Sequence, residues 1–545
     1  MPSLPPETLT GVLLPLIAVA VLALLFSVIY ARCYQRKRDA ECSTTVVIVL
    51  SLSVALLTLA FIPVDIFTVS SFKHFNGTFQ SWATNGSRKS VQDVFMYSYY
   101  TIYGLVMAFS FLILPFVYFY YEEKDEDKST GKRICSTLKY WIMFVVIAAV
   151  FMIIGAFVPW ATGESSRNTS KSVLGEAKLF LGSLESNSGE NAVSFTVSFL
   201  VLIGMVCVAL YTAVGMAVLP VDLIKGYRRV AEESEELMKT KKRHHVQRDH
   251  LRNRYADGKK MAKRDRRSKE YLEAQDRLLK KREKQLQRVS KGWLEKCRKC
   301  WRPFTVVIGI VLFLLAVLVF LSLLLSNIDR IRHGLGYHYG FLLKKSTLPS
   351  PIGELLLITQ PFFPLDYVII VIVTVYLVVA TIYGIRRIGI WCFCMRMYRI
   401  RPRRTATQGL MFMSFIVMLS VFSLSVVLTS LAPDYVRYGH QKYNTNCYFT
   451  ANNQTCVPCH GYCTLKMQER LCDPNDCVQT RIAVLVSRFC YKMWFFGVGY
   501  YACEWAFLGV YLLAFIVVLC RKSHSNVRDY VTSSDSESSS EETLL

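Results

Sequence analysis

Six cysteines crowd into one short stretch and are the densest group of chemically active residues in the chain. They are Cys447, Cys456, Cys459, Cys463, Cys472 and Cys477. An even number of cysteines in an oxidising compartment is typical of a disulfide framework. The spacing therefore predicts disulfides that staple one extracytosolic loop.

Two other chemistries could use the same residues. The run Cys456-Val-Pro-Cys459-His460 matches the C-x-x-C-H pattern of c-type haem attachment, and the same residues with Cys463 could form a zinc site. Haem attachment of this type belongs to other compartments. Outside the cytosol, oxidation competes with thiolate binding to a metal. Disulfides are therefore favoured over both alternatives.

Carboxylates in or beside apolar segments are the second group, because a charge inside a bilayer is costly and is a functional candidate by default. The pattern Pro-x-Asp occurs at the ends of three apolar segments, with Asp65, Asp222 and Asp366 as the acids. Proline removes a backbone donor and kinks a helix, so these patterns predict broken helices whose freed amides the carboxylates cap. A proton or substrate relay is the alternative.

Glu504 lies deeper than these acids, within the stretch WFFGVGYYACEWAFLGVYLL. It is the best candidate for an ionisable group inside the membrane, and we expect it to face a cavity or to pair with a neighbouring helix. The sequence contains no Walker A loop, metalloprotease helix or nucleophile elbow. Neither an ATP-driven pump nor a hydrolase is indicated, so we expect no enzymatic activity and no metal or other cofactor.

Nine apolar stretches, each long enough to cross a bilayer, must position these residues. The runs are continuously apolar rather than alternating, and the chain is 52% hydrophobic, so they indicate helices and not a barrel. The sequence predicts an all-α polytopic membrane protein with spans near 11–30, 45–70, 94–121, 138–160, 193–219, 304–326, 367–385, 408–432 and 494–520. A shorter apolar stretch at 353–363 is predicted to be interfacial or re-entrant.

The loops predict the orientation. Arg32, Arg36, Lys37 and Arg38 follow the first span, so the positive-inside rule places the N-terminus in the lumen. Nine spans then leave the C-terminus in the cytosol. N-glycosylation triplets fall only in loops that this count makes luminal, at Asn76, Asn85, Asn168 and Asn453.

Residues 225–302 form one long cytosolic insertion, with 28 Lys plus Arg against 12 Asp plus Glu. The spacing of Leu272, Leu279, Leu286 and Val289 predicts an amphipathic helix or a helical hairpin, turning at Asp257-Gly258. Attachment to the membrane at both ends argues against nucleic acid. Anionic lipid headgroups or a protein are the expected partners, and a solvated helix face is the alternative.

The tail ends in SSDSESSSEETLL, which is too polar to bury a core and is expected to be disordered. Leu544 and Leu545 resemble a dileucine sorting signal, which phosphorylation of Ser540 would complete. Tyr227 and Val230 fit a second sorting pattern, Tyr-x-x-hydrophobic.

The predicted layout has four parts. Residues 1–224 contain spans one to five and the glycosylated luminal loops, and residues 225–302 form the basic segment. Residues 303–520 contain spans six to nine and a Cys-rich luminal loop at 434–480, and residues 521–545 form the tail.

Several long blocks resemble the limb-region membrane protein family over nearly the whole chain, with the same nine-span layout. They are LPFVYFYYEEKDED (114–127), GAFVP (155–159), LPVDLIKG (219–226), FPLDY (363–367), GIRRIGIW (384–391), SLAPDYVRYG (430–439) and WAFLGVYL (505–512).

The resemblance implies a lysosomal membrane protein, with a plasma-membrane pool, that is needed for cobalamin to leave the lysosome as cargo. It implies an escort for an ABC-type cobalamin transporter, together with a cytosolic cobalamin-processing chaperone and a homo-oligomeric state. Two alternatives are a secondary transporter of cobalamin itself and an endocytic receptor that engages a clathrin adaptor and the insulin receptor. The family's adaptor-binding Trp-x-x-Phe pattern is absent at Trp293 and occurs instead at Trp301-Arg-Pro-Phe304.

Overall fold

The computed structural model describes most of the chain. The described residues are 6–36, 41–123, 130–161, 188–225, 230–255, 265–267, 271–272, 275–277, 279–280, 283, 293–334, 336–337, 340–341, 348–362, 364–392, 395–402, 405–445, 459–463, 477–491 and 493–520.

Within these residues, nine helices are long and apolar enough to cross a membrane, which confirms the predicted all-α polytopic class. They are α1 (Pro6–Tyr34), α2 (Cys42–Ser70), α3 (Asn85–Ala108) continued by η2 (Phe109–Ile113) and α4 (Leu114–Glu122), α5 (Thr130–Ala161), α7 (Ser188–Cys207) continued by η3 (Val208–Thr212) and α8 (Ala213–Lys225), α11 (Trp293–His333), α13 (Leu365–Ile388), α14 (Thr407–Leu431) and α17 (Trp494–Cys520). The η segments are π-helical.

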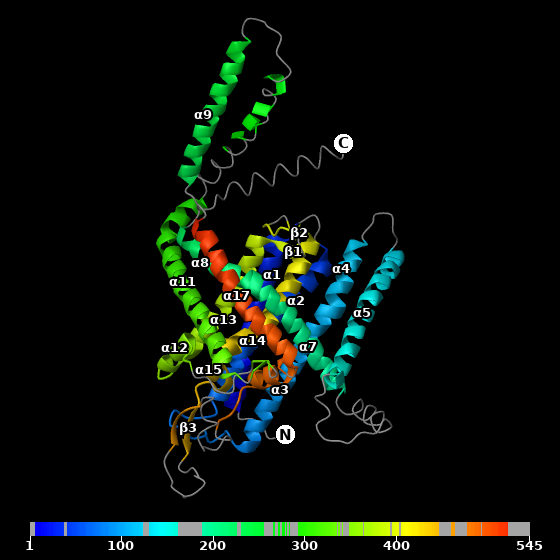
Figure 1. Ribbon diagram of the computed structural model, residues 1–545, viewed down its shortest axis with the longest axis vertical. Coiled ribbons are helices and arrows are strands. Elements are labelled where there is room, and N and C mark those ends of the chain that lie inside the picture. Colours follow the sequence, from blue (N-terminus) through cyan, green and yellow to red (C-terminus); the bar gives the residue numbers. More distant parts are fainter. Residues whose placement is uncertain are drawn as a thin grey trace. The chain divides into compact units, whose positions relative to one another are not determined.

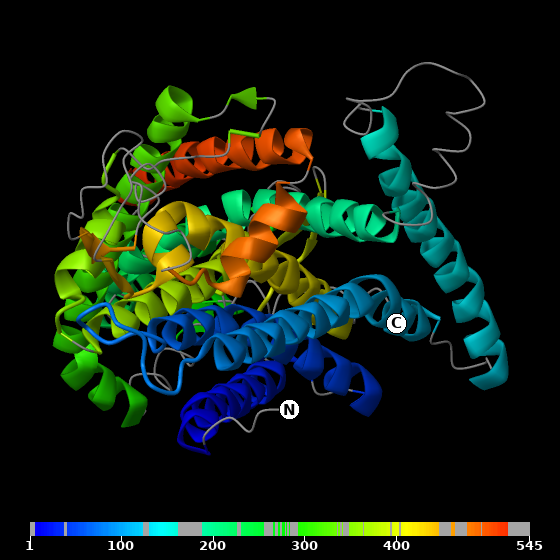
Figure 2. The same cartoon turned by 90° about the horizontal axis from the view of Figure 1, so that it is seen from below.

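The chain divides into two compact units. The first contains Met1–Met216 and Leu315–Ala514, and the second contains Ala217–Leu314 and Phe515–Leu545. Helix α14 is the centre of the first unit, because 83% of its span is buried, whereas only 11% of the span in α5 is buried. Helix α14 packs against α2 and α7, and α5 packs against α7 at the periphery (Figure 2).

Small residues let the helices of the first unit approach closely. A Cβ atom added at Gly215 would lie 1.7 Å from the Ala380 carbonyl oxygen, and one at Gly384 would lie 1.9 Å from that of Tyr211. The backbones of η3–α8 and α13 therefore touch, as small residues allow inside membranes. The hydroxyl groups of Thr212 and Thr381 join the same two segments at 2.7 Å.

The proline patterns do not break helices as predicted. Pro63 and Pro220 lie inside the continuous helices α2 and α8, while Pro364 precedes α13 at its N-cap position. A proline at a helix start removes only an amide that has no partner within the helix, so Pro364 needs no kink. The prediction of broken helices was therefore wrong.

Short elements cover one end of the first unit. They are α12 (Pro351–Thr359), α15 (Pro433–Tyr438), α16 (Arg481–Leu485), the π-helical η7 (Val486–Cys490) and the antiparallel strands β3 (Lys442–Thr445) and β4 (Cys459–Tyr462). Helix α12 overlaps the first part of the apolar stretch at 353–363 that was predicted to be interfacial or re-entrant. Its 9 residues are too few to cross a bilayer, and the Ser350 hydroxyl caps its start by accepting from the Gly353 amide at 3.1 Å. Strands β1 (Ile390–Cys392) and β2 (Met395–Tyr398) form a second antiparallel pair.

The second unit contains α9 (Val230–Arg254), the first part of α11 and the end of α17. Lys241 contacts Glu283 at 2.8 Å, and Arg248 contacts Asp276 at 3.7 Å. The later residue of α9, Arg248, contacts the earlier residue of the following segment, Asp276, so α9 and that segment run antiparallel, as in a helical hairpin (Figure 1). The turn of this hairpin, predicted at Asp257-Gly258, lies outside the described residues.

Candidate functional site

The residue with the strongest sequence signal, Glu504, lies in a buried polar cluster that joins three membrane-spanning helices. Its Oε2 atom lies 3.1 Å from a guanidinium nitrogen of Arg330 on α11. Its Oε1 atom accepts a hydrogen bond of 2.7 Å from the hydroxyl of Ser430 on α14, and Arg330 lies 2.6 Å from the same hydroxyl oxygen. Only 1% of the Glu504 side chain is exposed. Glu504 therefore pairs with neighbouring helices.

Sequence reasoning missed Arg330 because it ended the sixth span at residue 326. The helix continues through two more turns to His333, and the cluster Asp329, Arg330 and Arg332 follows directly on the apolar run. A basic residue at that point looks like an interfacial anchor, and only tertiary packing turns it inward. Arg330 also hydrogen-bonds Tyr491, whose pKa is raised by burial to about 12, so the phenol stays neutral.

Asn327 lies nearly one turn before Arg330 on α11 and is completely buried. Neither polar atom of its side chain has a hydrogen-bond partner among the described residues, although its backbone carbonyl accepts from the Tyr501 hydroxyl at 3.4 Å. Buried amides without partners are rare because their desolvation is uncompensated. The last turns of α11 therefore bury polar groups other than the ion pair.

Asp366 forms a second buried site, in the first turn of α13. Its Oδ2 atom accepts a hydrogen bond of 2.9 Å from the Tyr435 hydroxyl and lies 3.2 Å from Nδ1 of His440. Burial raises the pKa of Tyr435, so its phenol stays protonated and can donate. The Oδ1 atom of Asp366 and Nε2 of His440 are buried without a partner in the described part of the chain. Sequence reasoning missed His440, which lies 74 residues from Asp366.

The other two Pro-x-Asp acids have different surroundings. Asp65 on α2 is buried and accepts from the backbone amide of Ile482 at 2.9 Å and from the Tyr99 hydroxyl at 3.3 Å. It therefore caps an amide at the start of α16, and not one on its own helix. Asp222 is half-buried on α8 in the second unit.

The cysteine-rich loop contains a disulfide between Cys463 and Cys477, with Cα atoms 6.1 Å apart. The disulfide prediction is confirmed for this pair, and Cys463 is no longer a thiolate ligand for the alternative zinc site. Cys459 begins β4, while Cys447, Cys456 and Cys472 lie outside the described residues. No group of three potential metal ligands occurs among the residues that the structure describes.

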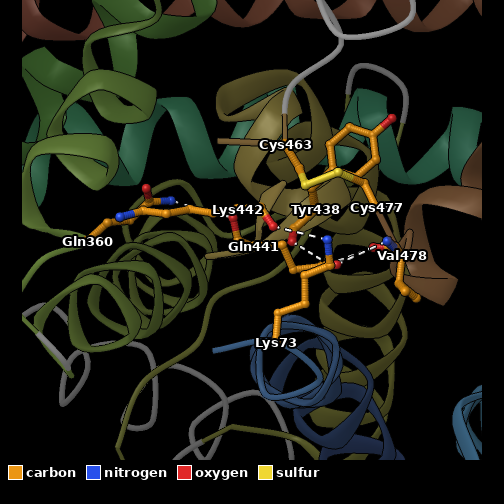
Figure 3. The surroundings of a disulfide bond; sticks show 9 residues. Lys73, Gln360, Tyr438, Gln441, Lys442, Cys463, Cys477 and Val478 are labelled. Carbon is orange, nitrogen blue, oxygen red and sulfur yellow. Dashed lines mark hydrogen bonds between the residues drawn. A yellow bond between two sulfur atoms is a disulfide. The ribbon is translucent and has the colours of Figure 1, made fainter. Parts of the chain in front are cut away.

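Gln441 holds the two ends of this loop together beside the disulfide (Figure 3). Its side-chain amide donates to the carbonyl oxygens of Tyr438 and Val478 at 2.8 and 2.7 Å, and its Oε1 accepts from the Val478 amide at 3.0 Å. Its backbone carbonyl accepts from the amide of Cys463 at 2.9 Å. Lys73, from the loop after α2, donates to the carbonyl of Lys442 at 3.0 Å. These bonds tie the loop after α2 to the disulfide region.

Two of the four predicted glycosylation sites lie in the described part of the chain, and both asparagines are exposed. The Asn76 side-chain oxygen accepts from the amide of Thr78 at 3.3 Å and from its hydroxyl at 2.7 Å. Asn85 begins α3, and its side-chain oxygen accepts from Arg88. Asn168 and Asn453 lie outside the described residues.

The sorting candidates are almost entirely outside the described part. Val230 is the first residue of α9, while Tyr227, Leu544 and Leu545 are not described. Trp301 and Phe304 of the Trp-x-x-Phe run are both exposed on α11. Arg302 between them donates to the carbonyl oxygens of Leu223 and Ile224 at 3.2 and 2.8 Å, which caps the end of α8.

Comparison with known proteins gives relatives over nearly the whole chain. A "Probable lysosomal cobalamin transporter" of Nematostella vectensis is 39% identical over 545 residues, covering 98% of both chains. The lysosomal cobalamin transport escort protein LMBD1 of Danio rerio is 39% identical over 96% of both chains. The human protein of the same name is 39% identical over 95% of this chain and 94% of its own.

No solved structure matches the chain. The profile of the LMBR1-like membrane proteins matches residues 12–302. That match includes the first five spans and the basic segment, and the relatives extend the similarity through the ninth span. On both grounds, this chain belongs to the LMBR1-like membrane protein family.

Proposed function

We propose that this protein serves the export of cobalamin from the lysosome to the cytosol as the escort of an ABC-type transporter. The observation that carries the proposal is the 39% identity, over 98% of both chains, to a protein named as a probable lysosomal cobalamin transporter, together with relatives named as transport escort proteins. The energy for transport would come from the partner, because this sequence has no Walker A loop.

The geometry around Glu504 supports an escort over a conduit. A transporter that couples cobalamin to proton movement through Glu504 needs a carboxylate that can change its partners during the cycle. Both oxygens of Glu504 are instead engaged, by Arg330 and by Ser430, and the side chain is buried. Breaking such a pair leaves an uncompensated buried charge, so the cluster acts as a lock between helices.

The proposed topology places the N-terminus and the disulfide loop in the lysosomal lumen and the α9 hairpin in the cytosol. In this orientation the basic hairpin is available to anionic lipid headgroups or to a cytosolic cobalamin-processing chaperone. Leu544 and Leu545 would direct the protein to the lysosome, with Tyr227 as a second signal.

Cells that lack the protein provide the test. We expect cobalamin to accumulate in their lysosomes and the ABC-type partner to stay outside the lysosome, and both defects to disappear when this chain is expressed again. Normal lysosomal localisation of the partner in these cells would contradict the escort role. The Leu544→Ala/Leu545→Ala variant should fail to restore export while it accumulates at the cell surface, and Ser540→Ala should have a weaker effect of the same kind.

A further inference from the structure

Helix α9 has an exposed face on which basic side chains stand beside apolar ones. The opposite side of the helix contains the buried Leu237 and, one turn later, Lys241, which bonds to Glu283 of the other arm of the hairpin. That side therefore faces the other arm. The exposed side chains recur every three or four residues and form what we call the outer face of α9. They are Met238, Lys239, Lys242, Arg243, Val246 and His250.

Two bases at the centre of the outer face have no acidic partner. Lys239 lies 2.7 Å from Glu235 on the same helix. Lys242 and Arg243 are exposed and contact no carboxylate among the described residues. Adjacent unpaired bases produce a positive potential, which attracts an anionic partner.

The tail of the same chain has the complementary charge. After Arg528 it contains no lysine or arginine, and its acids are Asp529, Asp535, Glu537, Glu541 and Glu542. Six serines stand among the acids between 533 and 540. Each phosphate added to a serine would contribute roughly −1.5 to −2 further charges.

The tail also starts beside the base of the hairpin. Lys225, the last residue of α8, donates to the carbonyl oxygens of Val518 and Leu519 at 2.7 and 3.0 Å. Helix α17 ends one residue later, at Cys520, and α9 begins five residues after Lys225, at Val230. The tail and the hairpin therefore leave the second unit from the same place.

The length of the tail is sufficient to reach the outer face. Arg243 is 13 residues beyond Val230, or roughly 20 Å along the helix, and the link from Lys225 adds at most about 17 Å. Asp535 follows Cys520 by 15 residues, which span up to roughly 50 Å. A short tether of this kind gives an effective concentration in the millimolar range, far above that of a separate protein.

We propose that the acidic stretch 529–545 binds the outer face of α9 in the same chain. An anionic bilayer is a weaker candidate, because its attraction falls off within a Debye length of about 8 Å, whereas the tail can follow the hairpin away from the membrane. An outside partner that takes the hairpin would release the tail together with Leu544 and Leu545. This contact goes beyond the escort function, and its test involves no cobalamin.

The test uses the full-length protein, one copy in each nanodisc of zwitterionic lipid, and a fluorescent peptide of residues 529–545 as the probe. A tail-neutral variant leaves the outer face free. Its substitutions are Asp535→Asn, Glu537→Gln, Glu541→Gln and Glu542→Gln. Fluorescence anisotropy should show that the peptide binds this variant at least about tenfold more tightly than the wild type, because the wild-type tail competes from within the same chain. Phosphorylation of the peptide at Ser540 should tighten binding further.

Charge reversal on the outer face tests where the peptide binds. Lys242→Glu/Arg243→Glu, added to the tail-neutral variant, should weaken peptide binding by about tenfold. Lys89→Glu/Lys132→Glu is the matched control and should leave binding unchanged, since both lysines are exposed and lie outside the hairpin, on α3 and α5.

Equal affinities of the wild type and the tail-neutral variant would overturn the proposal, and so would unchanged binding after the reversal at Lys242 and Arg243. Loss of peptide binding to the tail-neutral variant in nanodiscs that contain phosphatidylserine would overturn it as well, because the outer face would then belong to the bilayer.

Discussion

Arg330 and Glu504, which are 174 residues apart in the sequence, meet inside the helix bundle with a nitrogen–oxygen distance of 3.1 Å. Ser430 bonds to both of them, so α11, α14 and α17 are joined by one polar contact. A buried ion pair contributes little net stability relative to apolar residues of the same size, but losing one partner is costly. The pair therefore enforces one arrangement of these three helices.

Glu504→Gln should destabilise the protein, because Arg330 keeps its charge in a buried site without an anionic partner. The expected loss is about 3–5 kcal/mol, typical of a broken buried ion pair. Thermal unfolding of the purified protein measures the loss. The double variant Arg330→Met/Glu504→Gln should recover most of the stability, and purely additive effects of the two substitutions would contradict the pairing.

Asn327→Leu is the matched control on the same helix. Asn327 is as buried as Glu504, but its side-chain amide has no partner among the described residues. Replacing it by an apolar residue of similar size should leave stability unchanged or raise it. A loss as large as that of Glu504→Gln would mean that the amide is bonded in the folded protein.

Cys463→Ser and Cys477→Ser should each lower stability by about 3 kcal/mol, because the bridge closes a loop of some 15 residues. Since both substitutions break the same bond, the double variant should be no less stable than either single variant. Thermal unfolding without reductant measures this. Cys33→Ser, at a free and exposed cysteine, is the control. Additive losses would show that the two cysteines do not pair with each other.

Thiol labelling tests the predicted orientation. Cys42 and Cys135 are free and exposed, and the span count places both at the cytosolic side. A membrane-impermeant maleimide added to sealed lysosomes should therefore label them. Cys490 should stay unlabelled even after detergent, because burial raises the pKa of its thiol to about 12 and little thiolate forms at pH 8. If Cys42 and Cys135 are labelled only after the membrane is opened, both lie in the lumen and the orientation is the opposite of the predicted one.

Asn76→Gln should remove one glycan and lower the mass of the protein by the amount that a glycosidase removes at one site. The exposed Asn76 bonds to the Thr78 hydroxyl of its own triplet, whereas the Asn85 side chain is engaged by Arg88 at the start of a helix. We therefore expect modification at Asn76 to be more complete than at Asn85. Mass spectrometry of Asn76→Gln and Asn85→Gln compares the extent of glycosylation at the two sites. An unchanged mass in Asn76→Gln would mean that its loop lies in the cytosol or that the glycosylation enzyme cannot reach it.

The spans could be predicted from the sequence because each is a continuous apolar run, which needs no tertiary information. The ends of the helices could not be predicted in the same way. Helix α3 begins at Asn85, before its apolar part, and α11 continues past residue 326 to His333. Polar turns extend these helices because backbone hydrogen bonds and packing hold them there. The partners of Glu504 and Asp366 were also out of reach, since Arg330 and His440 come close only when distant segments pack together.

The most direct test of the escort role is cobalamin flux in liposomes that contain the purified protein. We predict no flux from this protein alone, with or without ATP, and ATP-dependent flux once the ABC-type partner is added. Glu504→Gln in the mixed liposomes should lower flux only as far as it lowers the amount of folded protein. Cobalamin flux through this protein alone would contradict the escort role and identify it as the transporter.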